Sequence, residues 1–112
     1  MSKFASTPRP PYYIVAFSNQ RTSSDAGYGE MAERMVELAS RQAGFLGIES
    51  TRDGNGFGIT NSYWKDEASI AAWKADVEHL AAQARGREQW YQHFELRVGR
   101  IERAYGFDRT ES

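Results

Sequence analysis

The chain of 112 residues is long enough for one modest hydrophobic core and too short for two independent ones. Apolar residues make up 40% and charged residues 26%, which is typical of a folded globular domain rather than a disordered or membrane-embedded chain. The net charge is −1 and no run of like charge stands out, so binding to nucleic acid or anionic lipid is not expected.

The absence of cysteine excludes disulfides, thiolate zinc sites, iron–sulfur clusters and cysteine nucleophiles. The longest apolar stretch, near residues 14–17, is far shorter than the roughly 20 residues that cross a bilayer, so we expect no membrane span. Residues 1–11 lack the apolar core of a secretory signal, and we expect a cytoplasmic protein. His79 and His93 are too far apart in sequence to give metal-ligand spacing, so no metal site is expected.

The N-terminal part of the chain predicts a leader followed by a strand. Pro8, Pro10 and Pro11 disfavour regular strand pairing, so residues 1–11 are expected to be an extended leader outside the core. Residues 12–18 are rich in aromatic and β-branched side chains, and both of their alternating sets are apolar. This pattern predicts a strand that is buried on both faces.

A helix and a hairpin follow. Residues 28–43 place their apolar side chains along one helical face and charged pairs, four residues apart, on the other, and Gly44 ends this helix. Residues 45–52 and 57–64 predict two strands. The turn between them, residues 53–56, contains two glycines and requires a positive φ, so the two strands form a hairpin.

The C-terminal half predicts a second helix and a last strand. Asp66 is the expected N-cap of a helix that runs to about Ala84. Residues 94–98 alternate as a strand, and the apolar pattern changes phase at Gly99, which predicts a β-bulge there. Residues 108–112 are expected to form a flexible polar tail.

The predicted order is βαββαβ, which indicates an α+β, ferredoxin-like fold with a four-stranded antiparallel sheet. Two helices cover only one face of such a sheet. The first and third predicted strands nevertheless carry large apolar side chains on both faces, so something else must bury the second face. The sheet of a second copy is the simplest partner, which predicts a homodimer closed into an α+β barrel.

Several short motifs narrow the family. They are Gly44-Phe45-Leu46-Gly47-Ile48-Glu49-Ser50, then Ser62-Tyr63-Trp64-Lys65-Asp66-Glu67 with Trp73, then His79, Gln83, Gly86-Arg87 and Tyr91, and a closing stretch through Val98, Ile101, Glu102 and Arg103 to Tyr105. Together these motifs resemble the antibiotic-biosynthesis-monooxygenase family over about residues 12–107. The resemblance implies a single ferredoxin-like domain there.

The resemblance also bounds the chemistry. The family includes cofactor-independent monooxygenases that oxidise polycyclic phenols with O₂, quinol oxidases and haem-degrading monooxygenases. The haem-degrading branch uses an Asn on the first strand, a Trp on the second helix and a His further along that helix, and Asn19 and Trp73 match the first two positions. Gln83 stands near the third position, and because glutamine is neither a proton shuttle nor a usual haem ligand, haem is disfavoured.

Three residues are candidate catalytic groups under this resemblance. Asn19 either opens a loop after the first strand or hydrogen-bonds a substrate oxygen and stabilises its developing negative charge. Trp73 either packs on the sheet or walls a pocket for a flat substrate. His79 projects about 150° from the apolar stripe of its helix. It is therefore either a surface histidine or, where the helix bends or a partner chain completes the pocket, the base that removes a phenolic proton.

Six further residues are candidate substrate-binding groups, and core packing is the alternative explanation for most of them. They are Asn61, Tyr63, Trp64, Gln83, Arg87 and Tyr91. Arg87 follows a glycine as in the family motif and either forms a buried salt bridge or binds an anionic group of the substrate.

Two functions remain open at this point. The resemblance implies a cofactor-independent monooxygenase that acts with O₂ on a small planar aromatic, phenolic or quinol substrate. The alternative is a non-catalytic ligand-binding or stress-related dimer of the same fold, which is favoured by Gln83 and by the outward projection of His79.

Overall fold

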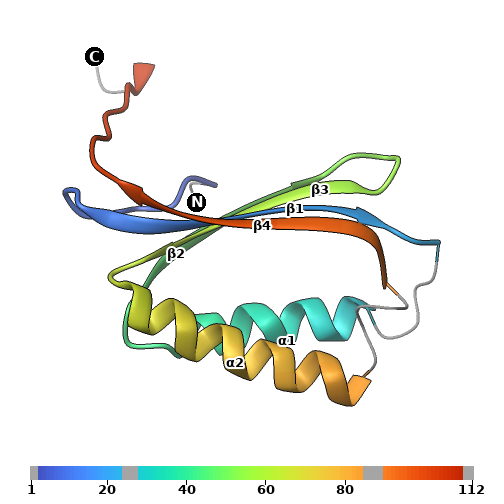
Figure 1. The fold of residues 1–112 in the computed structure, drawn as a ribbon. Helices are drawn as coiled ribbons and strands as arrows, with labels where there is room; N and C mark the ends of the chain where they lie inside the picture. The colour runs from blue at the N-terminus through green and yellow to red at the C-terminus, as the bar shows by residue number, and fades with distance from the viewer. Residues whose placement is uncertain (1–2, 24–27, 85–89, 110–112) are drawn as a thin grey trace.

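A computed structural model describes residues 3–23, 28–84 and 90–109. The elements are β1 (Tyr12–Arg21), α1 (Tyr28–Ser40), β2 (Phe45–Arg52), β3 (Phe57–Trp64), α2 (Glu67–Ala84) and β4 (Tyr91–Ile101). The four strands form one antiparallel sheet in the order β2-β3-β1-β4, and both helices lie on one of its faces (Figure 1). The predicted α+β ferredoxin-like fold is therefore confirmed.

The central strand β1 is longer than the sequence pattern predicted. Beyond Ser18 it continues through Asn19 and Gln20, which pair with both neighbours, to Arg21, which pairs with β4. Asn19 lies opposite Gly58 of β3 on one side and Phe94 of β4 on the other. The prediction that Asn19 follows the strand was wrong, because pairing on both sides satisfies the backbone of these polar residues as well as that of apolar ones.

The hairpin between β2 and β3 matches its prediction. Both the Asn55 and the Phe57 backbone N–H groups donate to Asp53 Oδ1, at 2.8 and 3.0 Å. Gly56 has a φ of 90°, a conformation that side-chain-bearing residues rarely adopt. The aspartate and the glycine together close the turn and fix the register of the two strands.

The β-bulge predicted at Gly99 was wrong. Gly99 pairs regularly with Ile14, and the pairing of β1 with β4 shifts instead between Gln20 and Arg21. The change of phase in the apolar pattern has another cause. Residues 94–98 place their apolar side chains toward the helices, whereas Ile101 lies opposite Tyr12 on the other face of the sheet.

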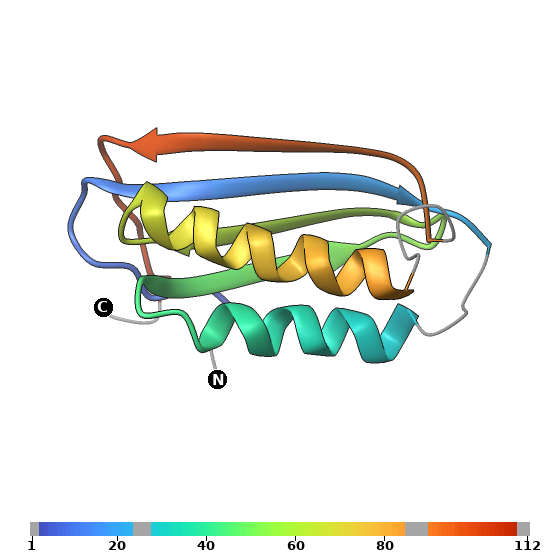
Figure 2. The ribbon, with the colours of Figure 1, turned by 60° about the horizontal axis from the view of Figure 1, so that its bottom comes forward.

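The core lies between the helices and the middle of the sheet. Its buried members come from β1, α1, β3 and α2, and they are Val15, Ala39, Trp64 and Ile70. Helix α2 begins where predicted, because the Ser69 backbone N–H donates to Asp66 Oδ1 at 2.8 Å. Viewed from the helical side, α1 and α2 run side by side and leave the edge strand β4 uncovered (Figure 2).

The other face of the sheet carries no helix. Part of the N-terminal segment lies against it, where the Ala5 backbone N–H donates to Glu49 Oε2 at 3.0 Å. Phe57 and Ile59 of β3 remain exposed on this face. The chain after β4 leaves the sheet on the same side, away from the helices (Figure 1). Within the described residues, neither helix is long and apolar enough to cross a membrane.

Candidate active site

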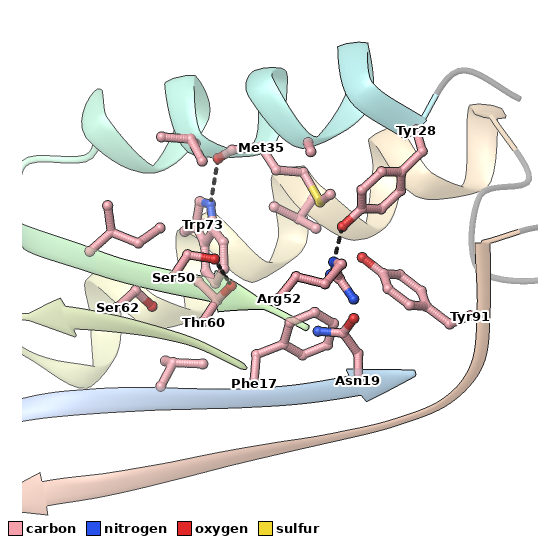
Figure 3. A pocket seen from close by; sticks show the side chains of 15 residues that line it. Phe17, Asn19, Tyr28, Met35, Ser50, Arg52, Thr60, Ser62, Trp73 and Tyr91 are labelled. Atoms are coloured by element: carbon pink, nitrogen blue, oxygen red, sulfur yellow. Dashed lines mark hydrogen bonds between the residues drawn. The ribbon is translucent and has the colours of Figure 1, made fainter. Parts of the chain in front are cut away.

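A cavity of about 250 Å³ lies between the helices and the sheet. Apolar side chains from all these elements form most of its wall, among them Val15, Met35, Val36, Ile48, Trp73 and Val77. Polar side chains also line it. Ser50, Thr60 and Ser62 lie near Trp73, and Asn19, Tyr28, Arg52 and Tyr91 lie at the end near the β2–β3 hairpin (Figure 3). The cavity thus has an apolar body and one polar end, as small-molecule sites commonly do.

Trp73 forms the apolar end of the cavity. Its indole Nε1 donates to the Met35 carbonyl oxygen of α1 at 3.4 Å. Its ring lies 5.2 Å from that of Trp64, tilted by 34°. Trp64 is completely buried and donates from Nε1 to Ser62 Oγ at 2.9 Å. The two explanations given for Trp73 are therefore compatible, since one face packs on the core while the side chain also lines the cavity.

Arg52 lies at the polar end because the sheet register leaves a gap there. The residue opposite it on β3 is Gly58, and a Cβ built on this glycine would come within 2.6 Å of the Arg52 guanidinium carbon. Arg52 Nη1 donates to the Gly56 carbonyl oxygen at 2.7 Å and Nη2 donates to the Tyr28 hydroxyl at 3.0 Å. These two hydrogen bonds hold the guanidinium at the polar end of the cavity.

Asn19 reaches the same end from β1. The side chain is only 2% exposed, and its Nδ2 makes a long contact of 3.4 Å with the Gly58 carbonyl oxygen. Its Oδ1 has no hydrogen-bond partner among the described residues. A buried acceptor without a partner is uncommon in folded proteins. At the wall of a cavity, such an acceptor can receive a hydrogen bond from a ligand.

Two tyrosines complete the polar end. The Tyr28 ring has the Arg21 guanidinium carbon 3.4 Å from its centroid and the Tyr91 ring at 6.1 Å, edge to face. Burial, followed by a hydrogen bond to the Tyr28 hydroxyl, raises the pKa of Tyr91 above its usual range. Tyr91 therefore keeps its proton at any physiological pH and offers a neutral hydroxyl to the cavity.

The structure gathers some of the predicted site residues and separates others. Asn19, Trp73 and Tyr91 line one cavity, and Trp64 lies directly beneath Trp73. Asn61 and Tyr63 pair with Ala16 and Ile14, which places them on the opposite face of the sheet, because side chains alternate between faces. The side chains of His79 and Gln83, on α2, and all of Arg87 lie outside the described residues.

On that opposite face, Tyr63 makes a different contact. Its hydroxyl donates to Glu49 Oε1 at 2.6 Å. Burial, with a further contribution from the Glu49 carboxylate, raises the pKa of Tyr63 to about 12. Because Glu49 also accepts from the backbone of Ala5, Tyr63 belongs to a contact between the sheet and the N-terminal segment.

Arg52 and Tyr28 were not predicted as site residues. Arg52 ends a strand and Tyr28 begins a helix, and such positions usually face solvent. The alternation of β2 does carry the signal, since Ile48, Ser50 and Arg52 share one face, and the apolar Ile48 marks that face as the inner one.

The sheet, its two covering helices and the mainly apolar cavity between them define an α+β domain with a pocket on the helical side of the sheet. Comparison with known families gives a more specific result. The antibiotic biosynthesis monooxygenase family matches residues 11–85, and the chain belongs to this family.

Individual relatives agree with this assignment. The chain is 48% identical over 103 residues to the uncharacterized protein YqjZ of Bacillus subtilis (strain 168), covering 92% of this chain and 90% of that one. It is 35% identical over 46 residues to the jasmonate monooxygenase ABM of Pyricularia oryzae, a match that covers 41% of this chain and 21% of that protein.

A solved structure shares the fold. The structure of SnoaB, a cofactor-independent oxygenase from Streptomyces nogalater, matches with a TM-score of 0.69 at 13% identity, covering 85% of this chain and 97% of that one. At so low an identity the likeness concerns the fold alone.

Proposed function

We propose that this protein is a cofactor-independent monooxygenase that uses O₂ to oxidise a small planar phenol or quinol. The observation that carries the proposal is the partly open, mainly apolar cavity whose lining includes Trp73 and the buried amide of Asn19, whose oxygen has no partner among the described residues. Membership of the monooxygenase family and the likeness to a cofactor-independent oxygenase support it.

The proposed reaction needs no external reductant. The phenolic hydroxyl loses its proton, and an electron-rich ring carbon that carries a hydrogen, para to the hydroxyl in a phenol or ortho to it in a quinol, forms a bond to O₂. Loss of the hydrogen on that carbon and cleavage of the O–O bond then give a p-quinone and one molecule of water. The substrate supplies all four electrons that O₂ accepts, so one oxygen atom enters the product and the other leaves as water.

The protein contributes position and environment rather than redox chemistry. The Trp73 ring provides a flat apolar surface against which an aromatic ring can stack. The apolar wall excludes water from the reacting carbon, and the Asn19 amide orients the oxygen-bearing end of the substrate. We assign proton removal to His79 on α2, as its place in the family motif implies.

A non-catalytic ligand-binding protein of the same fold is the second candidate. One observation favours it: the residues described as lining the cavity include no carboxylate and no imidazole to accept a proton. The same lining offers haem iron no imidazole or thiolate, and a cavity of about 250 Å³ is small even for a drug-sized ligand. Among the described residues, the donor set therefore does not fit haem.

We also propose that the protein works as a homodimer with the helix-free face of the sheet at the interface. Phe57 and Ile59 are exposed on that face, and Tyr105 and Phe107 are almost fully exposed on the segment after β4 that leaves the sheet on the same side (Figure 1). Burial of these four apolar side chains against a second copy would remove them from water.

Oxygen uptake tests the catalytic proposal directly. The protein is mixed with a panel of phenols, catechols and quinols, without added metal, flavin or reductant, and O₂ consumption is followed with an electrode. The proposal expects consumption above the buffer rate for at least one member and formation of the corresponding quinone. If no member is consumed faster than in buffer, while the same compounds bind, the non-catalytic candidate is correct.

A further inference from the structure

Arg52 brings a positive charge to an otherwise mainly apolar cavity, and no carboxylate neutralises it within the described part of the chain. Its hydrogen bonds there go to the Gly56 carbonyl and the Tyr28 hydroxyl, both neutral acceptors. These bonds use two of the five N–H donors of a guanidinium, so three remain for a ligand. This donor capacity plays no part in the function proposed above.

The position of the charge is fixed by the backbone. Gly58 leaves the space that the guanidinium occupies, and the bond to the Gly56 carbonyl holds it at the mouth of the hairpin. Because Arg52 is exposed to solvent, its attraction for an anion is moderated by water, and the apolar side of the cavity is where that attraction is strongest.

The other charged and titratable groups around Arg52 leave this end of the cavity positive. The Arg21 guanidinium of β1 lies over the Tyr28 ring and adds a second positive charge, and Tyr91 of β4 is neutral. Asp53, in the turn, is the nearest acidic residue in sequence, and its Oδ1 is already engaged by two backbone N–H groups. No acidic side chain is among the described residues that line the cavity.

Asn19 and Arg52 would bind different groups of a ligand, a hydrogen-bond donor and an acceptor. The guanidinium donates hydrogen bonds and favours a negatively charged oxygen, because such charge-assisted bonds are the stronger ones. The buried Oδ1 of Asn19 can only accept, so it requires a hydroxyl that has kept its proton. Both side chains reach Gly58, since the guanidinium fills the space of a Cβ there and Asn19 Nδ2 contacts its carbonyl oxygen, so a ligand that bridges them needs two neighbouring oxygens.

We infer that the site takes the monoanion of a planar aromatic with two adjacent hydroxyls, a catechol, with its ionised oxygen on Arg52 and its remaining hydroxyl donating to Asn19. This inference rests on the proposed function, since it names the substrate class of the same cavity. It also explains how a cavity lined by few proton acceptors holds the reactive, deprotonated form. The monoanion is stabilised where it binds, whichever base removes the proton.

The test measures binding without O₂, so that no turnover interferes. The probe is 4-nitrocatechol, whose neutral and ionised forms absorb differently, and 1,2-dimethoxy-4-nitrobenzene serves as a neutral analogue of similar shape. At a pH where 4-nitrocatechol is half ionised in water, addition of the protein is expected to increase the absorbance of the monoanion. The analogue should bind independently of pH.

Arg52→Gln identifies the residue responsible. This variant is expected to bind 4-nitrocatechol about tenfold more weakly, the effect of one charge-assisted hydrogen bond, and the dimethoxy analogue within about twofold of the parent protein. Arg41→Gln is the matched control. Arg41 is an exposed arginine that follows the last residue of α1 and forms an ion pair with Glu37. It should change neither affinity. Thermal melts check that both variants fold.

Two outcomes would overturn the inference. The first is an equal loss of affinity for 4-nitrocatechol and for the dimethoxy analogue in Arg52→Gln, which would mean that Arg52 only shapes the cavity. The second is protein-induced absorbance of the neutral form in the parent protein, a result that needs no variant. Neither outcome bears on catalysis, since oxygen uptake with phenols that lack a second hydroxyl would still establish the proposed reaction. Anion binding without oxygen uptake would leave the inference standing and contradict the proposed function.

Discussion

Arg52 and Asn19 lie on either side of Gly58, because the antiparallel register pairs Gly58 of β3 with Arg52 of β2 and with Asn19 of β1. The Arg52 guanidinium could not keep this position if residue 58 carried a side chain, since an added Cβ falls 2.6 Å from the guanidinium carbon. The polar end of the site therefore depends on a residue that contributes no chemistry.

Gly58→Ala should displace the guanidinium while keeping its charge. We expect weaker binding of the 4-nitrocatechol monoanion, approaching that of Arg52→Gln, with a change in unfolding free energy of about 1 kcal/mol or less. Isothermal titration and urea unfolding measure the two quantities. Gly54→Ala is the control, since a Cβ there meets nothing within 4 Å and its backbone needs no positive φ. Unchanged affinity in Gly58→Ala would show that the position of the guanidinium does not matter.

Asn19→Leu should separate function from stability. The turnover rate with O₂ is expected to fall about 100-fold, because the variant loses the acceptor that orients the substrate hydroxyl for reaction. The free energy of unfolding should stay the same or rise, because a buried acceptor without a described partner is replaced by an apolar group. Asn61→Leu, on the opposite face of the sheet, should leave the turnover rate unchanged. Equal loss of activity in both variants would contradict the assignment of the cavity as the active site.

His79→Ala tests the assigned base through its pH dependence. Without the imidazole, turnover should be slow at low pH and recover as the pH approaches the substrate's own pKa, where solution supplies the anion. The measurement is the rate of oxygen uptake across this range, with His93→Ala as the control. His93 is an exposed histidine of β4 that contacts Glu95. A pH-independent loss in His79→Ala would mean a structural role for that histidine.

Tyr63 should make the stability of the fold sensitive to alkali. Its pKa is raised from 10.0 to about 12 in the folded chain, so the folded chain holds this proton more tightly than the unfolded one. The contribution of the Tyr63 proton to the free energy of unfolding is complete below pH 10.0 and is lost as the pH rises toward 12. Urea unfolding of Tyr63→Phe should therefore show a shallower decline over that window. Tyr105→Phe, at a fully exposed position, should decline like the parent protein.

The helix-free face of the sheet can be tested by adding a charge. Ile59→Lys places an ammonium group in the proposed dimer interface and should shift a sedimenting dimer toward single protomers. Val36→Lys alters an apolar side chain of similar exposure on α1, on the other side of the molecule, and should sediment as the parent protein does. A parent protein that sediments as a stable protomer at all concentrations would end the dimer proposal.

The sequence predicted the fold well where local chemistry decides it. The Asp53 turn, the Asp66 cap and the bounds of β2 and β3 all follow from residues that are close in sequence. The site could not be predicted in this way, because it depends on the pairing register of strands that are far apart in sequence. Trp64 faces the helices, so Asn61 and Tyr63, an odd number of residues before it, must face away. The hydrogen bond between Arg52 and Tyr28 joins two residues that are 24 positions apart in sequence, which no local pattern contains.

Isotopically labelled O₂ tests the central claim most directly. The protein is given a catechol or phenol that it consumes, in unlabelled water and without reductant, and the quinone is analysed by mass spectrometry. The account predicts one labelled oxygen atom in each product molecule, one product for each O₂ consumed, and the second label in water. A quinone without label, or oxygen consumption no faster than in buffer, would contradict it.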